Sequence, residues 1–208
     1  MKGRRNPLVA TEGVPYTLVA TVLLGVAIYQ RHLEASLALA FVWLLVYLIF
    51  RDPIRKIPPS PLGVVSPVDG RVLSVETRTE GVLNGEAQCI RIRAHVLGAY
   101  TARSPSEGQV MDLRSADGAA SGELPVNAMW VQTDEGDDVL LQFSGFRFGL
   151  VPKSLLQFGD RVGQGWRAAH LRLARVAEVQ VGPAARVLVE PGQKVRAGSD
   201  LIAKLPSP

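Results

Sequence analysis

Asp69 is the carboxylate of this chain whose setting is most typical of a functional site. It lies in residues 66–70, with the sequence SPVDG, shortly after the motif FRDPIR at residues 50–55. A carboxylate held in a turn can orient a base, which then activates a hydroxyl nucleophile. An Asp-Gly turn is also common for structural reasons, because the aspartate accepts hydrogen bonds from backbone N–H groups. Asp69 is therefore expected to be catalytic only if a histidine and a hydroxyl accompany it.

The other polar groups do not form a metal site by their spacing. Zinc takes three or four ligands, and the chain after residue 56 has only two histidines, His95 and His170. Cys89 is the single cysteine, so no internal disulfide framework is possible. Arg103 begins the sequence RSPSEG and is a candidate for binding a phosphate or carboxylate, because a guanidinium suits planar anions. A surface arginine without a ligand is the commoner alternative.

Two uncharged apolar runs precede all of these groups, at residues 14–29 and 37–50. Each is slightly shorter than the ~20 residues that span a bilayer core, but helix ends and a snorkelling Arg31 can supply the difference. A signal peptide is disfavoured because the second run follows directly, and a buried hairpin is disfavoured because both runs are apolar all round. The sequence predicts a membrane hairpin over residues 1–56, with helices at about 14–30 and 34–50.

Basic residues stand on the outer side of both runs. They are Lys2, Arg4, Arg5, Arg51, Arg55 and Lys56. Since Lys and Arg mark the cytoplasmic side, we expect the cytoplasmic (inner) membrane as the location, with the rest of the chain facing the cytoplasm. The net charge of +4 is not clustered with aromatics in a recognisable module, which argues against nucleic acid as a partner. A phospholipid membrane with anionic headgroups explains the charge better.

The remainder of the chain has the pattern of a mainly β domain. Residues 57–65 contain three prolines and predict an extended linker. In residues 66–208, short apolar-alternating runs are separated by Gly, Asp and Pro, which is typical of an all-β sandwich or barrel. The expected strands are 71–76, 89–93, 128–132, 139–143, 174–181 and 186–189, with one short helix near 150–156.

Two segments, 159–165 and 192–198, share a Gly-x-x-Val-x-x-Gly rhythm. Such glycines permit tight hairpin turns, and the rhythm is common in lipoyl, biotinyl and related barrel-sandwich domains. A carrier domain would need a lysine at a hairpin tip between acidic and small residues, and the chain lacks that tripeptide. We therefore expect a barrel-sandwich-like domain without a carried group.

The order of these motifs resembles the short bacterial and archaeal type of phosphatidylserine decarboxylase proenzyme. The resemblance covers nearly the whole chain, from the two-helix N-terminus through residues 50–55, 66–70 and 103–108 to the turn at 192–198 and LIA at 201–203. It implies a membrane-attached enzyme of phospholipid metabolism that converts phosphatidylserine to phosphatidylethanolamine. It also implies a tendency to form dimers.

In that family, the resemblance implies, the proenzyme cuts its own backbone at a Gly-Ser bond. The serine becomes a pyruvoyl group, which forms a Schiff base with the substrate amine and accepts the electrons as carbon dioxide leaves. The family takes the carboxylate from Ser-Pro-x-Asp-Gly, the histidine from Asp-Val-His and the serine from a later Gly-Ser.

Of these three roles, only that of the carboxylate has a matching residue in the present chain. Asp69 matches it, but Tyr100 stands where the histidine is expected. His95 would serve only after a five-residue shift, and an odd shift along a strand turns the side chain to the other face. The serine position corresponds to Ala174, and residues 155–198 contain no Ser, Thr or Cys. The sequence therefore predicts that no pyruvoyl group forms and that no other cofactor or metal is bound.

Three interpretations follow. The favoured one is a non-catalytic, lipid-binding or regulatory homologue, with Arg103, His95, Phe146 and Phe148 as candidate lipid-contacting residues. The second is an active decarboxylase with an atypical site, or one completed by a partner decarboxylase subunit or a homodimer. The third is a purely structural membrane protein. The only Gly-Ser pair, Gly198-Ser199, falls too late in the chain to match the family's cleavage site.

Overall fold

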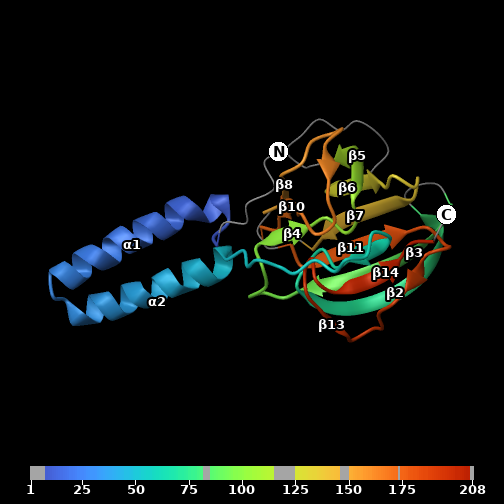
Figure 1. Cartoon of the computed structure of the whole chain (residues 1–208). Helices are drawn as coiled ribbons and strands as arrows, with labels where there is room; N and C mark the ends of the chain where they lie inside the picture. The colour runs from blue at the N-terminus through green and yellow to red at the C-terminus, as the bar shows by residue number, and fades with distance from the viewer. Residues whose placement is uncertain (1–7, 82–84, 115–124, 146–149, 173, 207–208) are drawn as a thin grey trace. The chain divides into compact units, whose positions relative to one another are not determined.

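The computed structural model describes residues 8–81, 85–114, 125–145, 150–172 and 174–206. The chain divides into two compact units, Met1–Ile54 and Arg55–Pro208 (Figure 1). The first unit contains a short 3-10 helix, η1 (Thr11–Gly13), and two α-helices, α1 (Val14–Tyr29) and α2 (Leu33–Phe50). The two helices expected from the apolar runs are thus present to within about one residue at each end.

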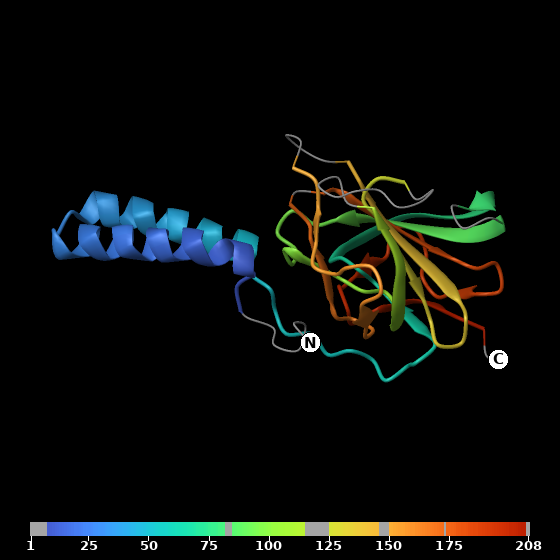
Figure 2. The same ribbon diagram turned by 90° about the horizontal axis from the view of Figure 1, so that it is seen from above.

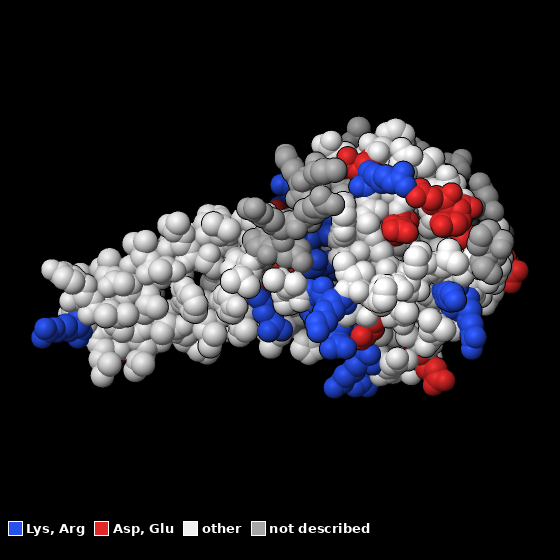
Figure 3. Space-filling model, in the orientation of Figure 1, with Lys and Arg blue, Asp and Glu red and all other residues white. Residues whose placement is uncertain are grey.

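Helices α1 and α2 pack side by side (Figure 2). The indole N–H of Trp43 donates a hydrogen bond of 2.8 Å to the hydroxyl of Thr21, and the ring of Tyr16 stacks on that of Phe50. Both helices are long and apolar enough to cross a membrane. Figure 3 shows their surface almost free of basic and acidic side chains. Helices that expose apolar side chains all round are suited to lipid rather than water.

The second unit is built of antiparallel strands, which confirms the mainly β class. The strands are β1 (Gly63–Val65), β2 (Gly70–Gly81), β3 (Gly85–Ala94), β4 (Thr101–Arg103), β5 (Gly108–Arg114), β6 (Ala128–Gln132), β7 (Asp138–Ser144), β8 (Lys153–Ser154), β9 (Arg161–Val162), β10 (Arg167–His170), β11 (Val176–Val181), β12 (Arg186–Val187), β13 (Lys194–Val195) and β14 (Leu201–Lys204). Eight form a large sheet in the order β13-β2-β3-β11-β7-β6-β5-β9. Two smaller sheets have the orders β1-β14-β12 and β4-β10-β8.

The structure differs from the expectation in residues 57–65 and in residues 150–156, among other places. Strand β1 lies inside the segment expected to be a linker, because Val64 and Val65 are β-branched, fully buried and paired with β14. Residues 150–156 do not form a helix. There, Ser154 pairs with Ala169 of β10, and its hydroxyl exchanges hydrogen bonds with the backbone of Leu156. A serine that bonds its own backbone competes with helix formation.

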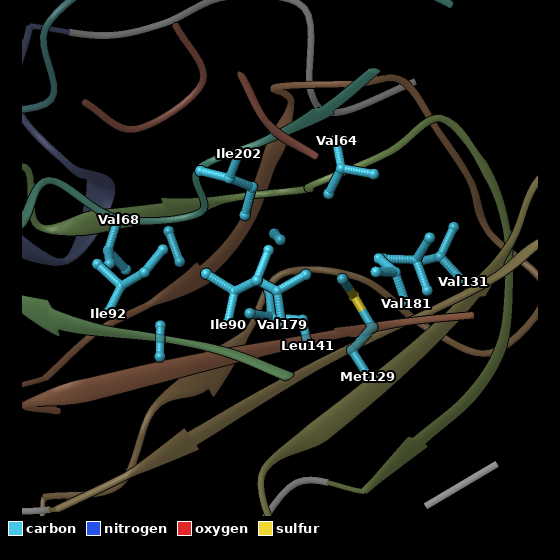
Figure 4. Packing of buried hydrophobic residues seen from close by; sticks show 14 of the residues in the cluster. Val64, Val68, Ile90, Ile92, Met129, Val131, Leu141, Val179, Val181 and Ile202 are labelled. Carbon is cyan, nitrogen blue, oxygen red and sulfur yellow. The ribbon is translucent and has the colours of Figure 1, made fainter. Parts of the chain in front are cut away.

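The core lies between the large sheet and the smaller ones. Alternate residues of β3, β7 and β11 point inward, including Ile90, Leu141 and Val179. Val64 of β1 and Ile202 of β14 face them (Figure 4). Each fully buried side chain of this kind contributes roughly 1.5–3 kcal/mol of transfer free energy. This packing fixes the ends of β1, β4 and β10, where the candidate site residues lie.

Candidate functional site

The carboxylate of Asp69 is held by three donors from separate segments. Oδ2 accepts hydrogen bonds from the Arg55 guanidinium at 2.5 Å and from the Ala99 backbone N–H at 2.9 Å. Oδ1 accepts one from the Ala197 N–H at 2.8 Å. The side chain is only 15% exposed. Asp69 therefore links the start of the β domain, the loop before β4 and the turn before β14, as an aspartate with a structural role does.

Arg55 is a site residue that sequence reasoning missed. The sequence places it among the cations flanking the membrane helices, but its side chain is mostly buried against Asp69. The sequence signal that could have identified Arg55 is its position at the end of FRDPIR, the motif that precedes SPVDG. Removing one partner of such a buried ion pair is strongly destabilising, because the other charge is left buried without compensation.

Tyr100 connects the Asp69 region to the turn between β10 and β11. It directly follows Ala99, whose N–H donates to Asp69. The Tyr100 carbonyl accepts a hydrogen bond of 2.9 Å from the N–H of Leu171. The rings of Tyr100 and His170 lie 5.4 Å apart, centre to centre. The structure thus brings together the three segments that contain Asp69, Tyr100 and Ala174.

The turn at residues 171–174 is closed by a hydrogen bond of 2.8 Å from the Ala174 N–H to the Leu171 carbonyl. Arg172 has φ +41°, in the left-handed region that non-glycine residues rarely adopt. Ala174 is 7% exposed, so its methyl group is buried. Ala174 carries no hydroxyl that could attack the preceding carbonyl.

The two histidines of the β domain have different surroundings. His95 is exposed in the loop that follows β3. Its ring Nδ1 accepts a hydrogen bond of 3.2 Å from the Leu97 backbone N–H, and its backbone N–H donates to the backbone carbonyl of Asp69. His170 is 1% exposed within β10. Across the described ranges, no group of three or more His, Cys, Asp or Glu side chains could hold a metal ion.

Arg103 is buried, so the surface-arginine alternative is wrong. It is 2% exposed, and its guanidinium donates to the Gly165 carbonyl at 3.4 Å. It stands directly opposite Arg167 in the β4–β10 pair. Arg167, a buried neighbour that sequence reasoning also missed, donates to the Thr101 hydroxyl at 3.5 Å. Phe146 and Phe148 lie outside the described residues.

Two pockets lie elsewhere in the β domain. One borders β10 with an apolar lining that includes Met129, Phe143 and Ala169, but its volume of about 20 Å³ holds little more than one water. The other has a volume of about 280 Å³ and is lined in part by Glu86, Asp137 and Asp138. Neither pocket is lined by Asp69, Tyr100 or Ala174.

Asp137 provides a test of the local electrostatics. Burial raises the pKa of its carboxyl above the ordinary 3.8, and Glu135 and Asp138 raise it further. The folded state therefore holds this proton more tightly than the unfolded state, and stability falls as the pH rises through the folded pKa. Asp137→Asn is expected to raise the unfolding temperature at neutral pH and to change it little below pH 3.8. Asp134→Asn, which breaks an ion pair with Arg161, should give no such gain. Equal effects of the two variants would contradict the assignment.

The fold and site define a class of protein: a mainly β domain of short antiparallel strands joined to two apolar helices. Curated relatives cover almost the whole chain. The phosphatidylserine decarboxylase proenzymes of Burkholderia ambifaria and Burkholderia pseudomallei are both 32% identical, over 96% and 97% of this chain and 97% of each relative. That of Nitrosomonas eutropha is 31% identical over 96% of both chains. The chain belongs to the phosphatidylserine decarboxylase proenzyme family.

No family model matches the chain. Among solved structures, the glucose permease IIA from Mycoplasma capricolum aligns with a TM-score of 0.48 and 18% identity, covering 68% of this chain and 94% of that one.

Proposed function

We propose that this chain is a membrane-attached member of the family that neither cuts itself nor carries a pyruvoyl group, and that it binds phospholipid headgroups instead of decarboxylating them. The observation that carries the proposal is the buried methyl group of Ala174 in the closed turn next to Tyr100. The relatives are named as proenzymes, and self-cleavage of a proenzyme at this turn would need a hydroxyl there.

The chemistry explains why the missing hydroxyl is decisive. Self-cleavage begins when a side-chain oxygen attacks the carbonyl of the preceding residue and forms an ester. Elimination releases the upstream chain as a carboxylate and leaves a dehydroalanine, which water hydrolyses to the pyruvoyl group with loss of ammonia. The oxygen must belong to the residue that follows the broken bond. A hydroxyl from another strand, such as that of Thr101 opposite His170, cannot supply it.

The Gly198-Ser199 pair is the one alternative cleavage point that the fold brings near Asp69. The N–H of the preceding residue, Ala197, donates to the Asp69 carboxylate, and Gly198 has φ +66°. The Ser199 hydroxyl makes no hydrogen bond to any described residue, so no base is in place to activate it. We therefore assign the pair to a structural turn.

Headgroup binding is proposed for the loop beside Asp69. The Leu97 N–H donates a hydrogen bond to Nδ1 of His95, so Nε2 is the ring nitrogen that can donate to a phosphate oxygen. His95 is exposed, whereas Arg103 is buried and its guanidinium donates to the Gly165 carbonyl. We propose His95 as the first contact and Arg103 as a deeper anion-binding group, with the β domain on the cytoplasmic side of the membrane.

The test uses the purified full chain in detergent with soluble short-chain phosphatidylserine and phosphatidylcholine. We expect saturable binding that prefers phosphatidylserine and no phosphatidylethanolamine in the product. His95→Gln should weaken binding about fivefold, the effect of one lost hydrogen bond, while the control His32→Gln should not. Formation of phosphatidylethanolamine would show an active decarboxylase with an atypical or partner-completed site. Binding without headgroup preference would contradict the proposal and favour a purely structural membrane protein.

A further inference from the structure

We infer that one face of the β domain is a docking surface for an anionic lipid bilayer, formed by a row of cations and an adjoining apolar loop. The row crosses the large sheet in register: Lys194 of β13 stands opposite Arg71 of β2, and Arg71 stands opposite Arg93 of β3. Arg175 lies beside the end of the row, where its carbonyl accepts a hydrogen bond from the Ala94 N–H at 2.7 Å. We call these four residues the basic row.

The three strand members of the row point away from the core. Their neighbours Val72, Ile92 and Val195 are buried core residues. Successive side chains of a strand point to opposite faces, so Arg71, Arg93 and Lys194 share the outer face, and all three are exposed. Figure 3 shows Lys and Arg side chains, with an acidic side chain among them, over the part of the β domain where β13 lies.

The charges of the row are not neutralised by the residues that the structure describes. None of its four members forms a hydrogen bond or ion pair through its side chain with any residue that the structure describes. Further along the same face, Glu178 neutralises both Arg78 and Arg91. Like charges directly opposite each other on a sheet are destabilising, and an external anionic surface would relieve that repulsion.

An apolar loop adjoins the row. Residues 95–98 follow β3 directly, and they expose 88% of Val96 and 47% of Leu97. The loop is held in shape by hydrogen bonds from the His95 N–H to the Asp69 carbonyl and from the Gly98 N–H to the His95 carbonyl. An apolar tip beside cations is the combination that binds an anionic membrane interface, where the tip enters the headgroup layer and the cations meet the lipid charges.

The bilayer is favoured over other anionic partners because the same chain carries two helices of membrane-crossing length and composition. The inference goes beyond headgroup binding at His95, since it concerns how the whole domain meets the membrane. It also holds whether or not the chain cuts itself.

The test places a polarity-sensitive fluorophore on Val96→Cys in the full chain, reconstituted in phosphatidylcholine vesicles with and without phosphatidylglycerol. Cys89 is fully buried, and burial raises the pKa of its thiol, so it should not be labelled. We expect a blue-shifted emission that brominated lipids quench, only in the anionic vesicles. The double variant Arg71→Gln with Arg93→Gln should lower the ratio of docked to undocked protein on the order of 25-fold, because each cation contributes a factor of about five.

The control is Arg186→Gln with Lys204→Gln, which also removes two cations that face each other across strands. It should leave the emission unchanged. A second variant of the row, Lys194→Gln with Arg175→Gln, should repeat the loss, and unfolding temperatures confirm that all variants are folded. The inference is overturned if the label stays in water on anionic vesicles, or if the control pair reduces docking as much as the row does. Neither result bears on phosphatidylethanolamine formation, so the two proposals fail separately.

Discussion

Asp69→Ala is expected to lower the free energy of unfolding of the β domain by about 3 kcal/mol. The variant removes the acceptor of three hydrogen bonds and leaves the Arg55 guanidinium mostly buried without its partner. Hydrogen bonds to charged groups contribute about 1.5–3 kcal/mol each, and part of that is recovered when water enters the space. Urea unfolding in detergent, followed by tryptophan fluorescence, measures the change.

Two controls separate this effect from a general loss of charge. Asp134→Ala breaks an exposed ion pair with Arg161 and should cost less than 1 kcal/mol, as surface pairs do. Arg55→Gln should cost less in the Asp69→Ala background than in the original chain, because the two residues act as a pair. If Asp69→Ala unfolds at the same urea concentration as the original chain, Asp69 does not organise the three segments.

Restoring the family's residues is expected to produce self-cleavage where the original chain has none. The variant combines Tyr100→His, Leu173→Gly and Ala174→Ser. The backbone of the turn is already closed between Leu171 and Ala174, and Tyr100 already bonds Leu171 through its carbonyl. The new hydroxyl and imidazole would therefore enter segments that are in contact with each other and with Asp69. We expect a slow split between residues 173 and 174.

The restored variant has its own matched comparisons. Ala174→Ser alone should remain intact, because a serine without a base attacks slowly. The restored variant with Asp69→Asn should cut more slowly, since the carboxylate is expected to orient the imidazole. A cut at 198–199 instead, abolished by Ser199→Ala, would mean that the wrong turn has been assigned to the family's cleavage position.

Much of the fold could be predicted from the sequence, for reasons that particular segments make clear. The apolar runs of α1 and α2 are uniform, and the alternation in β2, β3, β6, β7 and β11 is regular, so period and composition were sufficient. The strands β1, β4, β5, β8, β9, β10, β13 and β14 were not foreseen. Apart from the seven-residue β5, they have two to four residues, too few for a periodic signal, and they exist because distant partners, such as Ala169 for Ser154, supply their hydrogen bonds.

The candidate site was less predictable than the fold. Asp69 could be singled out by its motif, but its pairing with Arg55 and with the turn at Ala197 depends on chain segments 14 and 128 residues away. Arg103 was expected at the surface because arginine usually is, and it is buried because β4 lies inside the domain. The contact between Tyr100, just before β4, and His170 of β10 likewise joins two segments that no local pattern connects.

The intact mass of the purified full chain under denaturing conditions is the most direct test of the central claim. The account predicts one species of 22.4 kDa that does not react with a carbonyl-specific hydrazide. A fragment that begins at residue 199 and reacts with the hydrazide at its N-terminus would contradict it. Such a fragment would establish a pyruvoyl group, the group that decarboxylation in this family requires.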